Sequence, residues 1–347
     1  MGDSMSKRFN VVFVILLIAF LAFIGCSGKR GPAGVSATAE CLTCHADDSN
    51  IRAIDGQWSN SIHASGSNID RNTPPCSGCH TGQGFIGRIS NGSIDTIPQP
   101  DVINCFACHE PHTNKNFNLR TMAAVDLIQG GTFDRGTGNL CANCHQARTP
   151  SPDIPLTEGA ADSVFITNPF SGPYWGPHDG TQANVLSGQD AFVFTGAAYS
   201  NSPHTDEVTN GCPTCHMATP FKNIAGGHSV AMTYSEFGEE SDLTTGCADC
   251  HGDLTDFNVD GTQDSVATLL RNLRTILIAD SLLSPDTTSI TVKAPLRTSL
   301  VKAGAMYNFL LIYHDGSLGV HNTQFTMDIL NASIAKLSPE NLIASNR

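Results

Sequence analysis

The sequence is poor in basic, charged and aromatic residues. Charged residues make up 15% and aromatic residues 7% of its 347 positions, and 19 Lys and Arg face 32 Asp and Glu, which gives a formal net charge of -13. So acidic a chain repels phosphate groups, which argues against a nucleic-acid partner. Hydrophobic residues, at 40%, are a thin supply for a length that suits one large or two ordinary domains. Groups other than apolar side chains are therefore expected to fill part of the protein interior.

The apolar run near the N-terminus is too short to cross a membrane as a helix. It covers 14 residues, Val11–Ile24, after two basic residues, whereas a spanning helix needs roughly 20. This order predicts a signal peptide over residues 1–25, and therefore export. The small residue before Cys26 is similar to the end of a bacterial lipoprotein signal, so we expect a lipid anchor on Cys26. The alternative is a plain signal peptide followed by a stray cysteine. Residues 26–40, rich in Gly, Ala and Ser, are typical of a flexible tether.

No cysteine after the leader stands outside one repeated motif. The sequence has 13 cysteines, and all except Cys26 occur as Cys-x-x-Cys-His. The six copies are Cys41-Cys44-His45, Cys76-Cys79-His80, Cys105-Cys108-His109, Cys141-Cys144-His145, Cys212-Cys215-His216 and Cys247-Cys250-His251. A disulfide framework, the usual use of paired cysteines in an exported protein, gives no reason for the histidine. A zinc ribbon needs its Cys-x-x-Cys units in pairs that close a tetrahedron.

The spacing of the motif fits covalent attachment of haem. Residues i, i+3 and i+4 share one face of a helical turn. Both thiols can therefore bond the two vinyl groups of one haem, while the histidine binds the iron as its proximal ligand. The sequence predicts six covalently bound haem c groups.

With these motifs the chain resembles the multihaem c-type cytochromes of metal-reducing and related anaerobic bacteria, over about residues 41–337. The resemblance implies a mainly α fold with extensive loops and little β structure. Haem packing, rather than a conventional core, would hold it together. We expect a six-haem region over residues 41–255 and a C-terminal helical cover over residues 256–347, which supplies one distal histidine.

Seven histidines lie outside the motifs, one more than six haems need as distal ligands. The six predicted distal ligands are His63, His112, His178, His204, His228 and His321. Two of them, His63 and His204, share the frame aromatic-Ser-Asn-Ser-x-His ahead of a haem motif, so equivalent roles are expected. The alternatives are structural histidines, or Met217 and Met232 as sulfur ligands.

Three of these histidines need separate comment. His112 is too close to its own motif histidine, His109, to reach the other face of the same haem, so it is expected to serve a neighbouring one. His321 follows an Asp-Gly-Ser turn in a segment similar to one that supplies a distal histidine in multihaem cytochromes. His314 is expected to be the spare, a surface or helix-end histidine whose replacement changes nothing.

The C-terminal cover is expected to be helical. Apolar residues recur at helical spacing from Val266 to Leu277 and from Leu300 to Leu311, and a last helix is predicted over residues 323–335. A short strand is expected at residues 289–293.

Ahead of the first of these helices, Asp256, Asn258 and Asp260 match the first half of a calcium loop. Position 12 of such a loop is Ala267 instead of Glu. Capping of the helix that starts near Thr262, by Asp260, is therefore the favoured interpretation, and bound calcium is the alternative.

The resemblance implies electron transfer through a chain of six low-potential haems, each held by two histidines. We expect an exported protein in the periplasm or at the cell surface, anchored to the outer membrane, that passes electrons to redox proteins or extracellular acceptors. One alternative is a multihaem oxidoreductase of the nitrite or hydroxylamine type with one open haem, although the sequence has no Cys-x-x-Cys-Lys motif. The other is a subunit of a conducting homopolymeric filament.

Overall fold

A computed structural model describes residues 49–66, 68–114, 117–127, 130–147, 154–167, 175–286 and 289–338. The predicted leader, Cys26, the tether and the first haem motif, with Cys41, Cys44 and His45, lie outside the described residues. All described residues belong to one unit, Ser49–Arg347.

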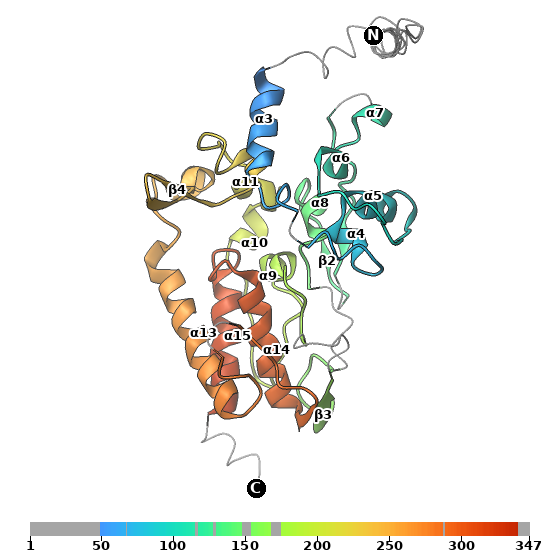
Figure 1. The fold of residues 1–347 in the computed structure, drawn as a ribbon. Helices are drawn as coiled ribbons and strands as arrows, with labels where there is room; N and C mark the ends of the chain where they lie inside the picture. Colours follow the sequence, from blue (N-terminus) through green and yellow to red (C-terminus); the bar gives the residue numbers. More distant parts are fainter. Residues whose placement is uncertain are drawn as a thin grey trace, which may run out of the picture. The chain divides into compact units, whose positions relative to one another are not determined.

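Short helices joined by long loops carry the haem motifs (Figure 1). Their bounds are α3 Ser49–Ser59, α4 Ser77–His80, α5 Gly82–Asn91, α6 Cys105–Cys108, α7 Pro111–Asn114, α8 Gly138–Ala142, α9 Gln182–Ser187, α10 His204–Glu207, α11 Cys212–His216 and α12 Ala248–His251. Three 3-10 turns lie among them: η1 Gly227–Ser229, η2 Thr244–Gly246 and η3 Val259–Gly261. Each described motif forms or adjoins one such helix.

Three long helices pack together in the C-terminal part: α13 Thr262–Ala279, α14 Leu300–Asp315 and α15 Thr323–Leu337 (Figure 1). In α13 the buried residues are Val266, Leu270, Leu273 and Leu277, the one-sided pattern that the periodicity predicts. Helix α14 is buried at every position from 303 to 312, so it lies at the centre of this group. Within the described part of the chain, no helix has both the length and the apolar character that crossing a membrane requires.

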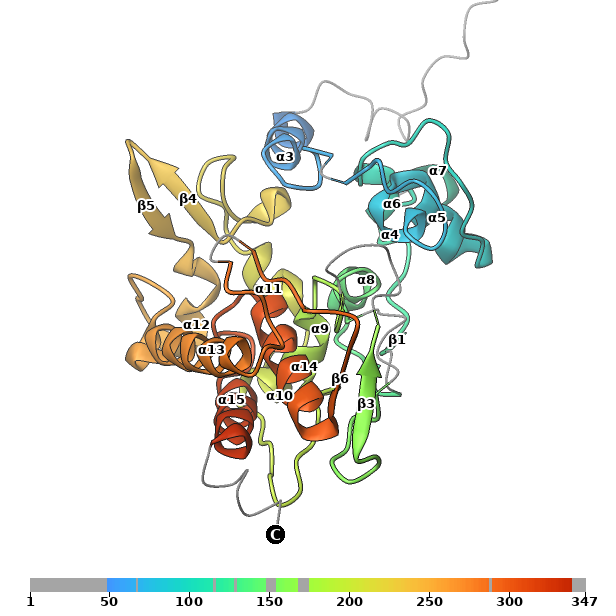
Figure 2. The same ribbon diagram turned by 60° about the horizontal axis from the view of Figure 1, so that its bottom comes forward.

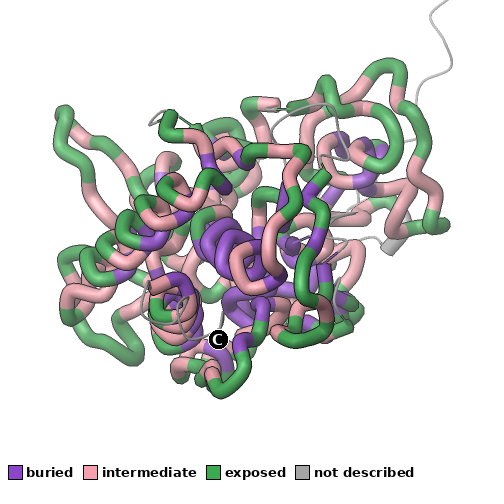
Figure 3. Tube along the Cα trace, turned by 90° about the horizontal axis from the view of Figure 1, so that it is seen from below, coloured by how far each residue is buried: buried purple, intermediate pink, exposed green. Residues whose placement is uncertain are grey.

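A conventional apolar core surrounds α14 (Figure 3). Phe192 and Phe194 pack into it from the segment before α10, and Ile166 joins it from a strand. Gly304 of α14 allows the close approach, because a Cβ there would lie 2.4 Å from the Phe192 ring. A conventional core was not expected from the sequence, and this part of the chain has one.

The β structure consists of three two-stranded antiparallel sheets in the described residues. They pair β1 Val125–Asp126 with β2 Thr132–Phe133 and β3 Ser163–Ile166 with β6 Leu296–Ser299. The third pairs β4 Thr233–Glu236 with β5 Glu239–Asp242 (Figure 2). The strand expected at residues 289–293 is wrong: a single bridge joins Val292 to Leu283, and the strand lies further along the chain, in β6. The chain is mainly α with extensive loops and little β structure.

The start of α13 is as predicted, at Thr262, but its cap is not. The N-cap residue is Gly261, at φ 71°, with no side-chain capping bond. The expected cap by Asp260 is therefore wrong: Asp260 lies in η3 at φ 52°. The side chain of Asn258 accepts from the Asp264 backbone N–H at 3.2 Å instead.

Candidate haem-binding site

Each described Cys-x-x-Cys-His motif contains a helical turn. In four of them the N–H of the histidine donates to the carbonyl of the first cysteine, at 2.8 to 3.1 Å, and the fifth forms α11 as a whole. The four bonds are His80 to Cys76, His109 to Cys105, His145 to Cys141 and His251 to Cys247. This turn puts the two cysteines and the histidine on one side, as attachment to a single haem requires.

Each described motif histidine faces one histidine from elsewhere in the chain. The distance between the ring centroids is 6.1 Å for His80 and His178, 6.3 Å for His109 and His228, 6.2 Å for His145 and His63, 6.3 Å for His216 and His321, and 5.8 Å for His251 and His204. The second member of every pair is a predicted distal ligand. In none of the five pairs does the distal candidate face a motif that is its neighbour along the sequence. His63, for example, precedes the second motif but faces His145 of the fourth.

These distances fit an iron atom between the two rings. Two imidazole nitrogens bound at about 2 Å to opposite sides of one metal ion place the ring centroids about 6.2 Å apart, once about 1.1 Å from nitrogen to centroid is added on each side. The residues present therefore fit a haem with one histidine on each face. Among the described residues, no group of three or more His, Cys, Asp or Glu side chains gathers as an isolated metal site, as zinc would need.

Hydrogen bonds at Nδ1 orient several of these rings. The acceptor is a backbone carbonyl for four of them: Phe117 for His109 at 2.7 Å, Asp179 for His178 at 2.7 Å, Val320 for His204 at 2.7 Å, and Val230 for His216 at 3.0 Å. For His145 it is Gln182 Oε1 at 3.4 Å, and for His321 it is Asp315 Oδ1 at 2.6 Å. An acceptor at Nδ1 selects the tautomer whose Nε2 lone pair can bind a metal.

Burial favours the neutral form, which can bind a metal, in two other paired histidines. It lowers the pKa of His63. It also lowers the pKa of His228, with a smaller contribution from the charge of His109. His228 is held in place by its backbone N–H, which donates to Gln57 Oε1 at 3.0 Å. The preceding Gly227 is at φ 51°, and a Cβ there would lie 2.3 Å from the same Gln57 oxygen, so this contact requires glycine.

Two predicted positions fall outside the five pairs. His112 is exposed on α7, with its ring 5.7 Å from that of Phe106. The remaining motif histidine, His45, lies outside the described residues, so the ligation expected of His112 stays a prediction.

His314, the predicted spare, is no surface side chain: only 16% of it is exposed. Its Nδ1 lies 2.9 Å from the Pro177 carbonyl and its Nε2 lies 3.0 Å from Asp179 Oδ1. Both ring nitrogens therefore contact residues that flank His178. Sequence reasoning missed this role, because the two segments lie far apart along the chain and no local pattern connects them.

The described motifs also contact one another. Helix α8, which begins the fourth motif, packs against α11 of the fifth, and the side chains of Cys141 and Cys212 lie close together. Helix α11 packs against η2, which leads into α12 of the sixth motif. Cys215 lies near Cys247.

Arg88 of α5 links the second motif to the fourth. Its Nε donates to the Gly78 carbonyl at 2.9 Å, and its Nη2 donates to the Asn143 carbonyl at 3.0 Å. Both acceptors lie between the two cysteines of a motif. The third motif adjoins the fourth as well, since Cys108 and Cys144 pack against the same small apolar cluster, which includes Ala107 and Leu140.

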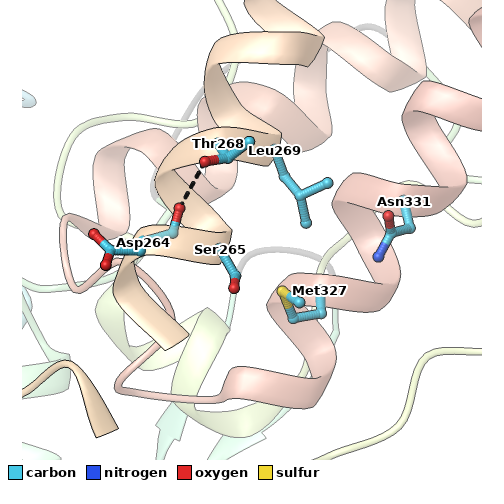
Figure 4. A pocket seen from close by; sticks show the side chains of 6 residues that line it. All are labelled: Asp264, Ser265, Thr268, Leu269, Met327 and Asn331. Carbon is cyan, nitrogen blue, oxygen red and sulfur yellow. Dashed lines mark hydrogen bonds between the residues drawn. The ribbon is translucent and has the colours of Figure 1, made fainter. Parts of the chain in front are cut away.

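One shallow pocket of about 390 Å³ lies between α13 and α15 (Figure 4). It is lined by Asp264, Ser265, Thr268, Leu269, Met327 and Asn331. Thr268 Oγ1 donates to the Asp264 carbonyl at 2.8 Å, and Asn258 Nδ2 donates to Asp264 Oδ2 at 2.9 Å. None of the lining residues belongs to a haem motif or to a histidine pair, so the pocket is a feature of the helical group.

No protein-family model matches the sequence, and no curated protein matches it. Among solved structures, the crystal structure of the outer cell wall cytochrome OcwA matches with a TM-score of 0.51 at 18% sequence identity. The chain shares its fold with a cytochrome. The match covers 81% of this chain and 50% of OcwA, so the chain spans about half the length of that protein.

Proposed function

We propose that this chain transfers electrons through six covalently bound haems, each held by two histidines. The observation that carries the proposal is the set of five histidine pairs at 5.8 to 6.3 Å, each with one motif histidine. In the proposal the motif cysteines hold the haems as thioethers, and His63, His178, His204, His228 and His321 bind iron opposite the motif histidines. His112 completes the set by binding the haem of the first motif, opposite His45.

Bound haem supplies an iron that gains and loses one electron reversibly. With an imidazole on each face, no coordination position is left for a substrate. Electron transfer therefore fits these pairs better than an oxidoreductase with one open haem. Two histidine ligands without methionine favour low reduction potentials.

Contacts between motifs support an order for the electron path. The fourth motif adjoins the second through Arg88, the third through the apolar cluster that Cys108 and Cys144 share, and the fifth through the packing of α8 on α11. The fifth in turn adjoins the sixth. In this proposal the fourth haem is a junction, from which one line continues through the fifth haem to the sixth.

We also propose export, with a lipid on Cys26 and the tether 26–40 holding residues 41–255 and their helical cover, 256–347, to the outer membrane. The name of OcwA places that cytochrome at an outer cell wall, which supports a surface location here. The partners would be redox proteins or extracellular electron acceptors, with a homopolymeric filament as the alternative if Cys26 carries no lipid.

Two measurements on the purified mature protein test the electron-transfer proposal. Mass spectrometry of the denatured chain should show six haem increments, because thioether bonds survive denaturation. Electron paramagnetic resonance should show only low-spin ferric haem. A high-spin haem in the unmodified protein that binds nitrite or carbon monoxide stoichiometrically would replace electron transfer with catalysis.

A further inference from the structure

A buried carboxylate contacts one of the paired histidines. Asp315 Oδ1 lies 2.6 Å from Nδ1 of His321, and the Asp315 side chain is 0% exposed. The other oxygen, Oδ2, accepts from the backbone N–H of Ser317 at 3.2 Å and from its hydroxyl. Ser317 thus supplies two donors to Oδ2, and Oδ1 can accept from His321 Nδ1 in the tautomer that leaves Nε2 free for a metal.

This acceptor differs from those of the other oriented rings. Four paired histidines donate to backbone carbonyls and His145 faces the amide oxygen of Gln182. All five acceptors are neutral. Among these oriented rings, His321 is therefore distinguished by a carboxylate at its Nδ1.

The local fold fixes the carboxylate and the ring relative to each other. Helix α14 ends at Asp315, and Gly316 follows at φ 73°. The backbone N–H of His321 donates to Ser317 Oγ at 3.3 Å. Gly319, at φ 93°, packs the loop against α13, where a Cβ would lie 2.9 Å from Val266 Cγ2. The contact therefore belongs to a built turn that ends the central helix.

We propose that Asp315 is a positioning residue that lowers the reduction potential of the haem held between His216 and His321; this inference rests on the proposed function. A ferric haem carries one more positive charge than a ferrous haem, so a nearby buried carboxylate stabilises the ferric form, and little solvent screens it. A carboxylate acceptor also makes the imidazole a stronger donor to iron. In the reduction, one electron enters the iron, no bond breaks, and the proton stays on Nδ1.

The lowered reduction potential would act in the middle of the proposed electron path. The fifth motif adjoins the fourth and the sixth, so its haem lies within the proposed line. A lower potential raises the energy of an electron on the fifth haem. Transfer from the fourth haem to the sixth through it therefore includes an uphill step.

Asp315→Asn in the full haem-loaded protein tests the inference. The amide keeps the shape and an acceptor oxygen but removes the charge. We expect the reduction equilibrium constant of one haem to rise at least tenfold, which is about 59 mV for a one-electron couple. The matched control is Asp162→Asn, which removes the same charge from an exposed side chain and should leave all six potentials unchanged. Spectroelectrochemical titration gives the potentials.

If Asp315→Asn does not mature, the wild-type protein still provides a test. A redox titration followed by nuclear magnetic resonance assigns potentials to individual haems. Among the five described pairs, the haem of His216 and His321 should be oxidised first as the potential rises. A variant or a titration with six low-spin haems but without the expected shift or order overturns the role of Asp315. Fewer than six low-spin haems in the wild type would instead count against the proposed function.

Discussion

The Nε2 atom of His314, in the last turn of α14, lies 3.0 Å from the carboxylate of Asp179, the residue after His178. A histidine that faces no motif histidine thus contacts the loop of one that does. A second contact, from Nδ1 to the Pro177 carbonyl, holds the other side of His178. His314 does lie at the end of a helix, as one of the two expectations had it, but its side chain is not free at the surface.

We therefore expect His314→Ala to weaken ligation of the second haem. Loss of both contacts frees the loop, so a fraction of that iron should lose His178 and become high-spin. Electron paramagnetic resonance measures the fraction, and His178→Ala gives the full signal for comparison. The conservative variant His314→Gln can restore one contact and should give a smaller fraction. An unchanged low-spin spectrum in His314→Ala would mean that the loop holds His178 without help.

Arg88 should stabilise the contact between the second and fourth motifs. Arg88→Ala removes its hydrogen bonds to Gly78 and Asn143. We expect a loss of about 2 kcal/mol in the free energy of unfolding, as for partly buried bonds with a charged donor. Arg88→Lys keeps the charge but not the planar fork that reaches both carbonyls, so it should recover less than half of the loss. Thermal unfolding, followed in the far ultraviolet, measures both. Equal stability of the alanine variant and the wild type would contradict the prediction.

The ion pair between Glu158 and Lys336 should make the helical cover sensitive to acid. Burial opposes ionisation of Glu158, but hydrogen bonds from Lys336 and from the Thr195 N–H outweigh it and hold the pKa below its usual value. A lowered carboxyl pKa stabilises the fold above the unfolded pKa of about 4.3, and this stability is lost as the pH falls through the folded pKa.

Lys336→Gln should therefore lower stability at pH 7 by about 0.5 kcal/mol, the size of a partly exposed pair, and by much less near pH 3. Unfolding midpoints at the two pH values test this. Glu158→Gln is the matched variant and should show the same pH pattern. A loss in Lys336→Gln that is independent of pH would indicate packing of the lysine stem instead of the charge.

The motifs and the long helices could be predicted from the sequence because their signals are local. A Cys-x-x-Cys-His turn needs five neighbouring residues, and the α13 stripe repeats every three to four. The pairing of histidines could not be predicted, because loops without periodicity bring the members of each pair together. The apolar core was missed for a related reason: average composition hides that its residues gather around α14. The cap at α13 was misassigned because Asn and Asp are both favoured near the start of a helix. The positive φ of Asp260, which the sequence does not reveal, leaves the contact with the first helical turn to Asn258.

The pairing of His63 with the fourth motif gives the sharpest test of the site. His63 precedes the second motif in sequence, yet its ring faces His145 at 6.2 Å. His63→Ala should therefore produce one high-spin iron by leaving the fourth haem with a single histidine. In a chain whose fourth motif carries Cys141→Ser and Cys144→Ser, and so binds no haem there, adding His63→Ala should produce no further high-spin signal. In a chain with Cys76→Ser and Cys79→Ser, which lacks the second haem, the signal should appear in full. The opposite result in these two backgrounds would assign His63 to the second haem and refute the pairing.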